Sequence, residues 1–243
     1  MAQEALGVSS EVARAFANAN IFFFINLPIP PHTHSIPVLY DVSFYGINIF
    51  TPEILKSIFG AEDLSALCWQ TIVVSAVGMP ACALAIFCLQ RYGGKKLMFY
   101  GFLTNAIAFL ALGIVYSLYP DPTASGASPV KPYLKFTIFC ASMFSLNWGP
   151  NLATYVVPLS AFPIEVRGTF HGLSAASGKA GAALGAFLYP VVISSLGSTG
   201  PQTIFFIQVA VNGLGALLAW RFISNTVREE TSEEVYEELL VNN

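Results

Sequence analysis

Charged residues are scarce in this chain, since Asp, Glu, Lys and Arg fill 10% of its 243 positions, against about 25% in a typical soluble domain. Cysteine is also sparse, and the four that are present lie in apolar stretches without the spacing of a metal site or a secreted disulfide scaffold. No basic stripe indicates nucleic-acid binding, and no set of nucleophile, base and oxyanion donors indicates an enzyme. We therefore expect no metal, no cofactor and no nucleic-acid partner.

Hydrophobic residues dominate instead, at 55% of the chain with a mean hydropathy of +0.63. A helix of about 20 apolar residues crosses the roughly 30 Å of hydrocarbon in a bilayer. Five clear runs of this kind lie at 67–89, 97–118, 134–157, 169–196 and 204–223. A sixth, weaker run contains residues 38–46 and ends near Leu55. The pattern predicts an all-α integral membrane protein, a bundle of six transmembrane helices.

The segment before the weak run differs from the remainder of the chain. Residues 26–37 hold four prolines, and proline interrupts a helix because it lacks the backbone donor. We expect Pro37 to prevent helix at the start of the first span. Residues 1–37 read as an irregular segment without the basic start and cleavage site of a secretory signal. This favours a fragment or a mispredicted gene model that has lost the preceding part of a longer protein.

The distribution of Lys and Arg predicts the orientation, because short cytoplasmic loops collect positive charge. If the spans alternate, residues 91–96, Arg167, Arg221 and Arg228 fall on one side, and fewer basic residues fall on the other. We therefore expect a cytoplasmic C terminus in a multi-pass plasma-membrane protein. The acidic tail at 226–243 fits a solvated cytoplasmic segment, and its apolar edge could alternatively bind a partner helix.

Polar residues within the apolar runs carry the functional hypothesis. Asn147, Asn151 and Lys179 lie inside two stretches that are otherwise apolar enough to span a bilayer. A polar or charged side chain at that depth costs several kcal/mol by most scales, and it commonly marks a substrate or ion pathway. The sequence therefore predicts a transport protein.

Four motifs resemble the major facilitator superfamily, and in particular the phosphate:proton symporters of fungi and plants. The loop at 90–96, QRYGGKK, is similar to the basic inter-helix loop of the superfamily. The stretches NWGPNLATYVVP at 147–158 and HGLSAASGKAGA at 171–182 resemble the tenth and eleventh helices of the phosphate branch. DVSFYGIN at 41–48 is more loosely similar to its seventh. The resemblance spans about 38–225 and implies the C-terminal six-helix half of a twelve-helix transporter.

The resemblance also implies a binding site for inorganic phosphate. It assigns Asp41, Tyr45 and Asn151 to the phosphate, and Asp41 with Lys179 to proton coupling. Asp41 and Tyr45 are four residues apart, so on a helix they share one face. A protonated Asp41, or a phosphate hydroxyl that donates to it, would couple anion binding to proton binding. Lys179 would then offset the charge of the anion, with a proton gradient as the driving force.

Structural explanations stand beside these assignments. Asp41 could lie where its helix enters the membrane, and Lys179 could extend to the interface from a helix end. Asn147 and Asn151 could bond neighbouring helices or the backbone freed by Pro150. His171 is more typical of a structural residue than of a proton relay. Small residues four apart predict close helix packing rather than a ligand-binding loop, at Gly172 with Ala176, Gly178 with Ala182, and Gly181 with Gly185.

Some positions depart from the pattern of the phosphate branch. Pro37 stands where the family has a tryptophan one turn before the aspartate, and Glu165 replaces the first of two expected basic residues. A six-helix half also lacks the other half that alternating access requires. The missing half, a second copy or another chain would have to complete it. A sugar or organic-ion porter of the same superfamily, and a non-transporting membrane subunit or regulator, remain alternatives.

Overall fold

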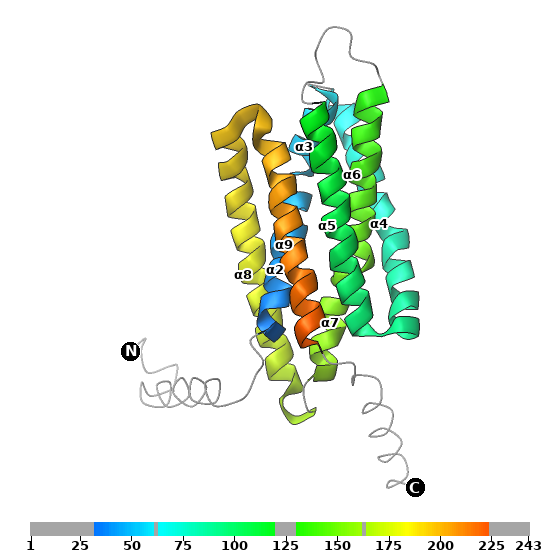
Figure 1. The fold of residues 1–243 in the computed structure, drawn as a ribbon, viewed down its shortest axis with the longest axis vertical. Coiled ribbons are helices and arrows are strands. Elements are labelled where there is room, and N and C mark those ends of the chain that lie inside the picture. Colours follow the sequence, from blue (N-terminus) through cyan, green and yellow to red (C-terminus); the bar gives the residue numbers. More distant parts are fainter. Residues whose placement is uncertain (1–31, 61–62, 120–129, 162–163, 224–243) are drawn as a thin grey trace, which may run out of the picture.

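The computed structural model describes residues 32–60, 63–119, 130–161 and 164–223, and its regular structure in those ranges is helical. The helices run side by side as one elongated bundle (Figure 1). Residues 1–31 and 224–243 lie outside the described residues. They include most of the predicted N-terminal segment at 1–37 and all of the predicted acidic tail at 226–243. The elements are α2 (His32–Ile49), α3 (Thr51–Phe59), α4 (Leu64–Tyr92), α5 (Gly94–Leu118), α6 (Val130–Trp148), α7 (Pro150–Ala161), α8 (Ile164–Leu196), η1 (Gly197–Thr199) and α9 (Gly200–Phe222).

Four of the described helices, α4, α5, α8 and α9, are long and apolar enough to cross a membrane. The shortest of them has 23 residues, which at 1.5 Å per residue is about 34 Å of helix. The predicted runs at 67–89, 97–118 and 169–196 lie within α4, α5 and α8, and the run at 204–223 ends one residue beyond α9. These four predictions are confirmed, because an unbroken apolar run of this length has few alternatives to a helix.

The two remaining predicted spans are each divided. The run at 134–157 becomes α6 and α7, which are separated at Gly149, and the first run becomes α2 and α3, which are separated at Phe50. Pro150 lacks the amide that would continue α6. Gly149 packs directly on Gly101 of α5, where a side chain on either residue would collide with the other backbone. The expectation of six unbroken helices is therefore not met.

The first helix also begins earlier than expected. α2 starts at His32 and carries Pro37 in its interior, so the expectation that Pro37 prevents helix there is wrong. Only one backbone hydrogen bond is lost at an internal proline, and neighbouring helices offset that loss in a membrane protein. Pro37 packs against α8, since its Cβ would lie 3.5 Å from a Cβ on Gly178.

Glycines on α8 bring it against α2. A Cβ on Gly181 would collide with the Val38 carbonyl oxygen, and a Cβ on Gly185 would lie 2.6 Å from the Val42 carbonyl oxygen. Small residues let helix backbones approach this closely, and the predicted packing role of both glycines is confirmed. The same prediction for Gly172 is wrong, because nothing lies within 4 Å of a Cβ placed there.

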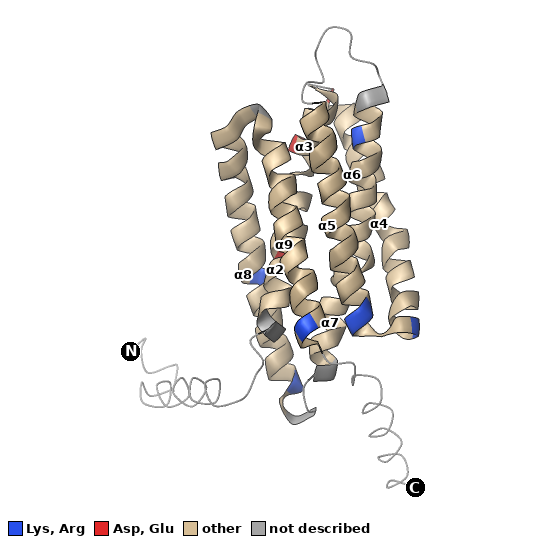
Figure 2. Ribbon diagram, in the orientation of Figure 1, with Lys and Arg blue, Asp and Glu red and all other residues tan. Residues whose placement is uncertain are grey.

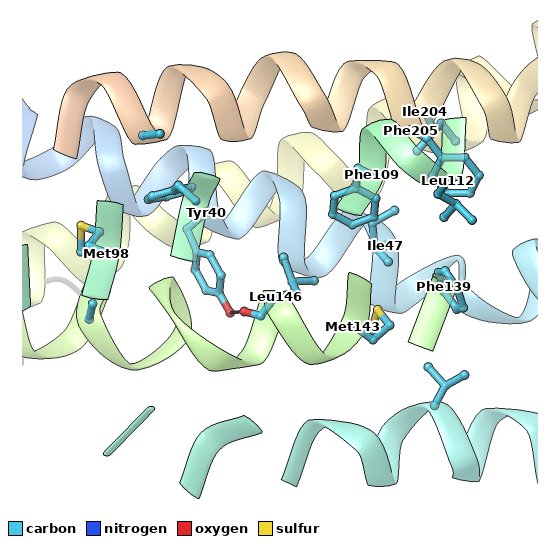
Figure 3. Close-up of a cluster of buried hydrophobic side chains, with 14 of the residues drawn as sticks. Tyr40, Ile47, Met98, Phe109, Leu112, Phe139, Met143, Leu146, Ile204 and Phe205 are labelled. Carbon is cyan, nitrogen blue, oxygen red and sulfur yellow. Dashed lines mark hydrogen bonds between the residues drawn. The ribbon is translucent and has the colours of Figure 1, made fainter. Parts of the chain in front are cut away.

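The apolar core lies between α2, α5, α6 and α9 (Figure 3). Phe109 of α5 stacks on Phe205 of α9 with ring centroids 6.3 Å apart. Tyr40 of α2 is fully buried, and its hydroxyl donates to the Leu146 carbonyl of α6 at 3.3 Å. That hydrogen bond satisfies the phenol inside the core and holds α2 to the divided helix.

Most of the described basic residues gather at one end of the bundle (Figure 2). This end contains the turn between α4 and α5, where Gly93 adopts a φ of +81° that other residues rarely take. The chain therefore reverses direction within a short turn between these two helices. The residues concerned are Arg91, Lys95, Lys96, Arg167 and Arg221. We call this region the basic end of the bundle.

Candidate functional site

Three of the four predicted site residues meet between α2 and α8. The Lys179 ammonium of α8 donates to the Tyr45 hydroxyl at 2.7 Å and to Asp41 Oδ2 at 3.3 Å. It also lies 4.3 Å from the centroid of the Tyr45 ring, within the range of a cation–π interaction. Residues 134 to 138 positions apart in sequence thus form one cluster, which we call the Lys179 cluster.

Each member of the Lys179 cluster lies in the interior of its helix. Asp41 lies near the middle of α2, not at its first turn, and Lys179 lies near the middle of α8. The Asp41 side chain is 13% exposed, whereas the Lys179 side chain is 55% exposed. Glycine at 178 makes the contact possible, because a Cβ there would lie 3.0 Å from Asp41 Oδ2. The carboxylate is therefore held against the bundle, and the ammonium is open to an approaching group.

Asn151 lies elsewhere among the described contacts. Its amide donates to Asn147 Oδ1 at 3.2 Å and approaches the Cys82 sulfur at 3.8 Å. Asn147 in turn donates to the Met143 carbonyl at 2.9 Å. These bonds hold the two asparagine side chains together at the break between α6 and α7. The structure does not bring Asn151 to the Lys179 cluster.

A cavity of about 60 Å³ extends from the Lys179 cluster. Because about 10–15 Å³ by this measure holds one water, it has room for several waters or a small ion. Its wall comes from three helices, α2, α7 and α8. The lining residues are Pro37, Asp41, Thr154, Tyr155, His171, Ser174, Ala175, Gly178 and Lys179.

Four polar residues of this wall were not predicted to contact a ligand, namely Thr154, Tyr155, His171 and Ser174. One signal in the sequence could have identified two of them. His171 and Ser174 are three residues apart, so the helical repeat places these two polar side chains on one face of α8. Thr154 and Tyr155 follow Asn151 by one turn, but no local pattern distinguishes them from a lipid-facing pair.

A buried polar network lies beside the cluster, on the opposite side of α2. The Gln208 amide of α9 donates to the Ser43 carbonyl at 3.2 Å and to the Tyr189 hydroxyl. The Asn212 amide donates to Ser43 Oγ at 3.1 Å. All four residues are essentially inaccessible to solvent. The network connects α2, α8 and α9 two residues from Asp41, and it thereby positions that part of α2.

The chemistry available at the cluster is that of an anion site. An exposed ammonium and a phenol can both donate to oxyanion oxygens, and the adjacent carboxyl can accept or release a proton. Among the described residues, no group of three or more His, Cys, Asp and Glu side chains could hold a metal ion. The donor set thus suits a small anion and a proton.

Comparison with known proteins identifies the family. A model of the sugar (and other) transporter family matches residues 42–238, which is most of the chain. The inorganic phosphate transporter PT2 of Toxoplasma gondii is 35% identical over 197 residues, covering 79% of this chain and 32% of its own length. A probable inorganic phosphate transporter, 1-6, of Arabidopsis thaliana is 34% identical over 75% of this chain and 35% of its own length. The chain spans about a third of the length of these relatives.

A solved structure shares the fold. It is that of a proton:xylose symporter of the major facilitator superfamily bound to 6-bromo-6-deoxy-D-glucose, with a TM-score of 0.65 at 20% identity. The alignment covers 88% of this chain and 44% of the symporter chain. The match of the family model, the multi-pass helical bundle and this shared fold together show that the chain belongs to the sugar (and other) transporter family of the major facilitator superfamily and is an integral membrane protein.

Proposed function

We propose that the chain is the C-terminal half of a proton-coupled inorganic phosphate transporter, with Asp41, Tyr45 and Lys179 at its substrate site. The observation that carries this proposal is the Lys179 ammonium, held mid-bundle by Tyr45 and Asp41 and open to a ligand. The names of the relatives from Toxoplasma gondii and Arabidopsis thaliana, both described as inorganic phosphate transporters, support the choice of anion.

In this proposal the bundle makes six crossings. The pairs α2–α3 and α6–α7 each cross once, with a break at Phe50 and Gly149, and α4, α5, α8 and α9 supply the other four. The transmembrane unit then corresponds to 38–225, extended at its start by the first residues of α2, which take up the end of the segment predicted at 1–37. A tail at 226–243 follows it. A second six-helix half, another chain or a second copy completes the pathway, because alternating access needs two halves around one site.

Proton coupling follows because the Asp41 carboxylate and the anion compete for the Lys179 ammonium. While Asp41 is ionised, its carboxylate neutralises the ammonium at 3.3 Å and repels an approaching anion. A proton on Asp41 removes that negative charge and frees Lys179 to bind phosphate. Tyr45 can then donate its hydroxyl proton to a second phosphate oxygen. Anion and proton therefore bind together, with the proton gradient as the driving force and no organic cofactor. Asn151, held by Asn147 in this structure, joins the site in the proposal only if its amide turns from that partner.

Uptake of labelled phosphate by the complete protein in proteoliposomes tests this function. We expect Asp41→Asn to abolish uptake driven by a proton gradient, because the neutral amide cannot carry the proton. Lys179→Ala should abolish uptake because it removes the charge that binds the anion. Glu53→Gln and Lys56→Ala are matched controls, since both residues are exposed on α3. Near-normal uptake in both site variants, with the protein present in the membrane, would overturn the assignment.

A sugar or organic-ion porter is the second candidate. The family model describes sugar transporters among others, and the structural relative binds a hexose derivative. Competition separates the two functions. Uptake that falls with excess glucose and ignores excess phosphate favours the sugar porter. A non-transporting regulatory subunit is favoured if the chain is always isolated with a different protein and no substrate binds.

For localisation, we propose the plasma membrane with the basic end of the bundle in the cytoplasm. The supporting observation is the concentration of Lys and Arg there (Figure 2), as cytoplasmic loops of membrane proteins show. The C-terminal end of α9 lies at this end (Figure 1). The tail at 226–243 then begins on the cytoplasmic side.

A further inference from the structure

His171 lines the same cavity as Asp41 and Lys179. It precedes Lys179 by eight residues on α8, so its Cα is about 12 Å nearer the N-terminal end of that helix. That direction leads to the basic end of the bundle, where Arg167 follows one more turn along. The cavity therefore runs from the Lys179 cluster toward the basic end, with an imidazole at its far part.

The His171 ring is not satisfied by the protein within the described part of the chain. Its Nδ1 is buried and has no hydrogen-bond partner there. A buried polar atom without a partner is rare and costly in a native structure. In an otherwise tightly packed wall, such an atom would disfavour the fold. The residue lines a cavity that reaches an ammonium and a carboxyl, so a turn of the side chain would present this atom to a polar ligand there.

Other polar groups surround the same part of the cavity. Ser174 of α8 and Thr154 of α7 are both buried, and the half-exposed Tyr155 lies beside Thr154. The Thr154 hydroxyl donates to the Pro150 carbonyl at 2.9 Å, which leaves its oxygen able to accept. Asp41 of α2 and Lys179 of α8 are the charged groups that line the cavity with His171. Residues that carry hydroxyl and imidazole groups, from two helices, thus line one small cavity.

We propose that His171 forms a second oxyanion position in this cavity, one that receives the anion between the Lys179 cluster and the basic end. The inference rests on the proposed function, because it takes an oxyanion as the substrate. The imidazole donates a hydrogen bond to the anion when the anion leaves Lys179. The position lies about 12 Å along α8 from Lys179, a length set by the helical rise, and it gives the anion a stopping point before the basic end. His171 thereby governs the rate of passage more than binding at the first position.

Two nearly isosteric substitutions separate this role from packing. His171→Asn keeps an N–H donor near the position of Nδ1, and His171→Leu fills similar space without a donor. We expect the leucine variant to lose about 10- to 100-fold in the rate of labelled phosphate exchange, the range for removing a hydrogen bond to a charged group. The asparagine variant should retain most of the rate. In both variants the phosphate concentration that gives half-maximal exchange should change little, because the first position is intact.

Cysteine protection gives a second readout that does not depend on transport. Ala175 lines the cavity, and its neighbour Ala176 does not. In the complete protein with its native cysteines replaced, we expect inorganic phosphate to slow the reaction of Ala175→Cys with an anionic thiol reagent. Ala176→Cys, at nearly the same depth, should show no such protection. Introducing His171→Leu should abolish the protection at position 175.

The outcomes distinguish this inference from the proposed function. If phosphate protects Tyr45→Cys but not Ala175→Cys, the function stands and the second position does not exist. Equal exchange rates in the asparagine and leucine variants, either both normal or both lost in folded protein, would likewise overturn the role of His171. If phosphate protects none of the three cysteines and no phosphate exchange occurs, the proposed function fails first.

Discussion

At the scale of single residues, Lys179 is held by groups that a substrate oxygen can replace. The Tyr45 hydroxyl accepts its shortest bond at 2.7 Å, and Asp41 accepts a longer one at 3.3 Å. The ring of Tyr45 adds a contact that does not need the hydroxyl. The two parts of the tyrosine therefore act separately, the ring on the ammonium and the hydroxyl on either the ammonium or a ligand.

Tyr45→Phe tests the part played by the hydroxyl. It keeps the ring below Lys179 and removes one donor for the anion, so we expect the KM for phosphate to rise about 10-fold, since one hydrogen bond to a charged group is lost. The measurement is the concentration dependence of phosphate uptake by the complete protein. Tyr100→Phe, at an exposed tyrosine of α5, should leave KM unchanged. An unaltered KM in the Tyr45 variant would show that its hydroxyl does not contact the substrate.

At the scale of elements, the contact between α2 and α8 decides which residues meet. Asp41 and Lys179 are 138 positions apart, and their pairing depends on glycines that let α8 lie directly on the α2 backbone at Val38 and Val42. The spacing of these glycines predicted close packing. It could not predict which helix they pack against, because small residues fit any partner backbone.

Gly181→Ala tests this packing. The added methyl would collide with the Val38 carbonyl, and such overpacking costs about 1–3 kcal/mol. We expect a lower melting temperature in detergent and a loss of uptake, because Asp41 moves away from Lys179. Gly172→Ala is the matched control on the same helix. Its methyl meets open space, and replacing a helical glycine by alanine is worth up to about 1 kcal/mol, so its stability should stay equal or rise. Equal melting temperatures in the two variants would contradict the packing role of Gly181.

The helix breaks show where sequence reasoning ends. Unbroken apolar runs were sufficient to predict α4, α5, α8 and α9, because hydrophobic length alone identifies a membrane helix. The same criterion ran through Gly149 and Phe50, because an average over about 20 residues does not register a local break in the backbone. Pro37 produced the opposite error: it predicted a break in the helix, but α2 continues through it. For the site, the resemblance supplied Asp41, Tyr45 and Lys179, whereas His171 became a candidate only when its cavity was known.

At the scale of the whole molecule, the six alternating crossings that we propose would give the bundle a definite sidedness. The starts of α2, α5 and α8 and the ends of α4, α7 and α9 then lie at the basic end, and the remaining helix ends lie opposite. In Figure 1 the start of α2 and the end of α9 are at the same end of the bundle as the turn between α4 and α5. A divided helix still carries the chain across, provided that its two pieces stay roughly collinear.

Accessible cysteines test this arrangement in sealed vesicles of known orientation. With the four native cysteines replaced, we expect a membrane-impermeant thiol reagent to label Ser65→Cys, Tyr133→Cys and Thr199→Cys from one side only. Lys96→Cys, Gly168→Cys and Arg221→Cys should react only from the other side, because an odd number of crossings separates each member of one set from each member of the other. All six residues are exposed in the structure. Tyr133 and Gly168 are the decisive pair, since only α6 and α7 separate them. Labelling of both from the same side would show that the divided helix does not span the membrane, and the six-crossing arrangement would then be wrong.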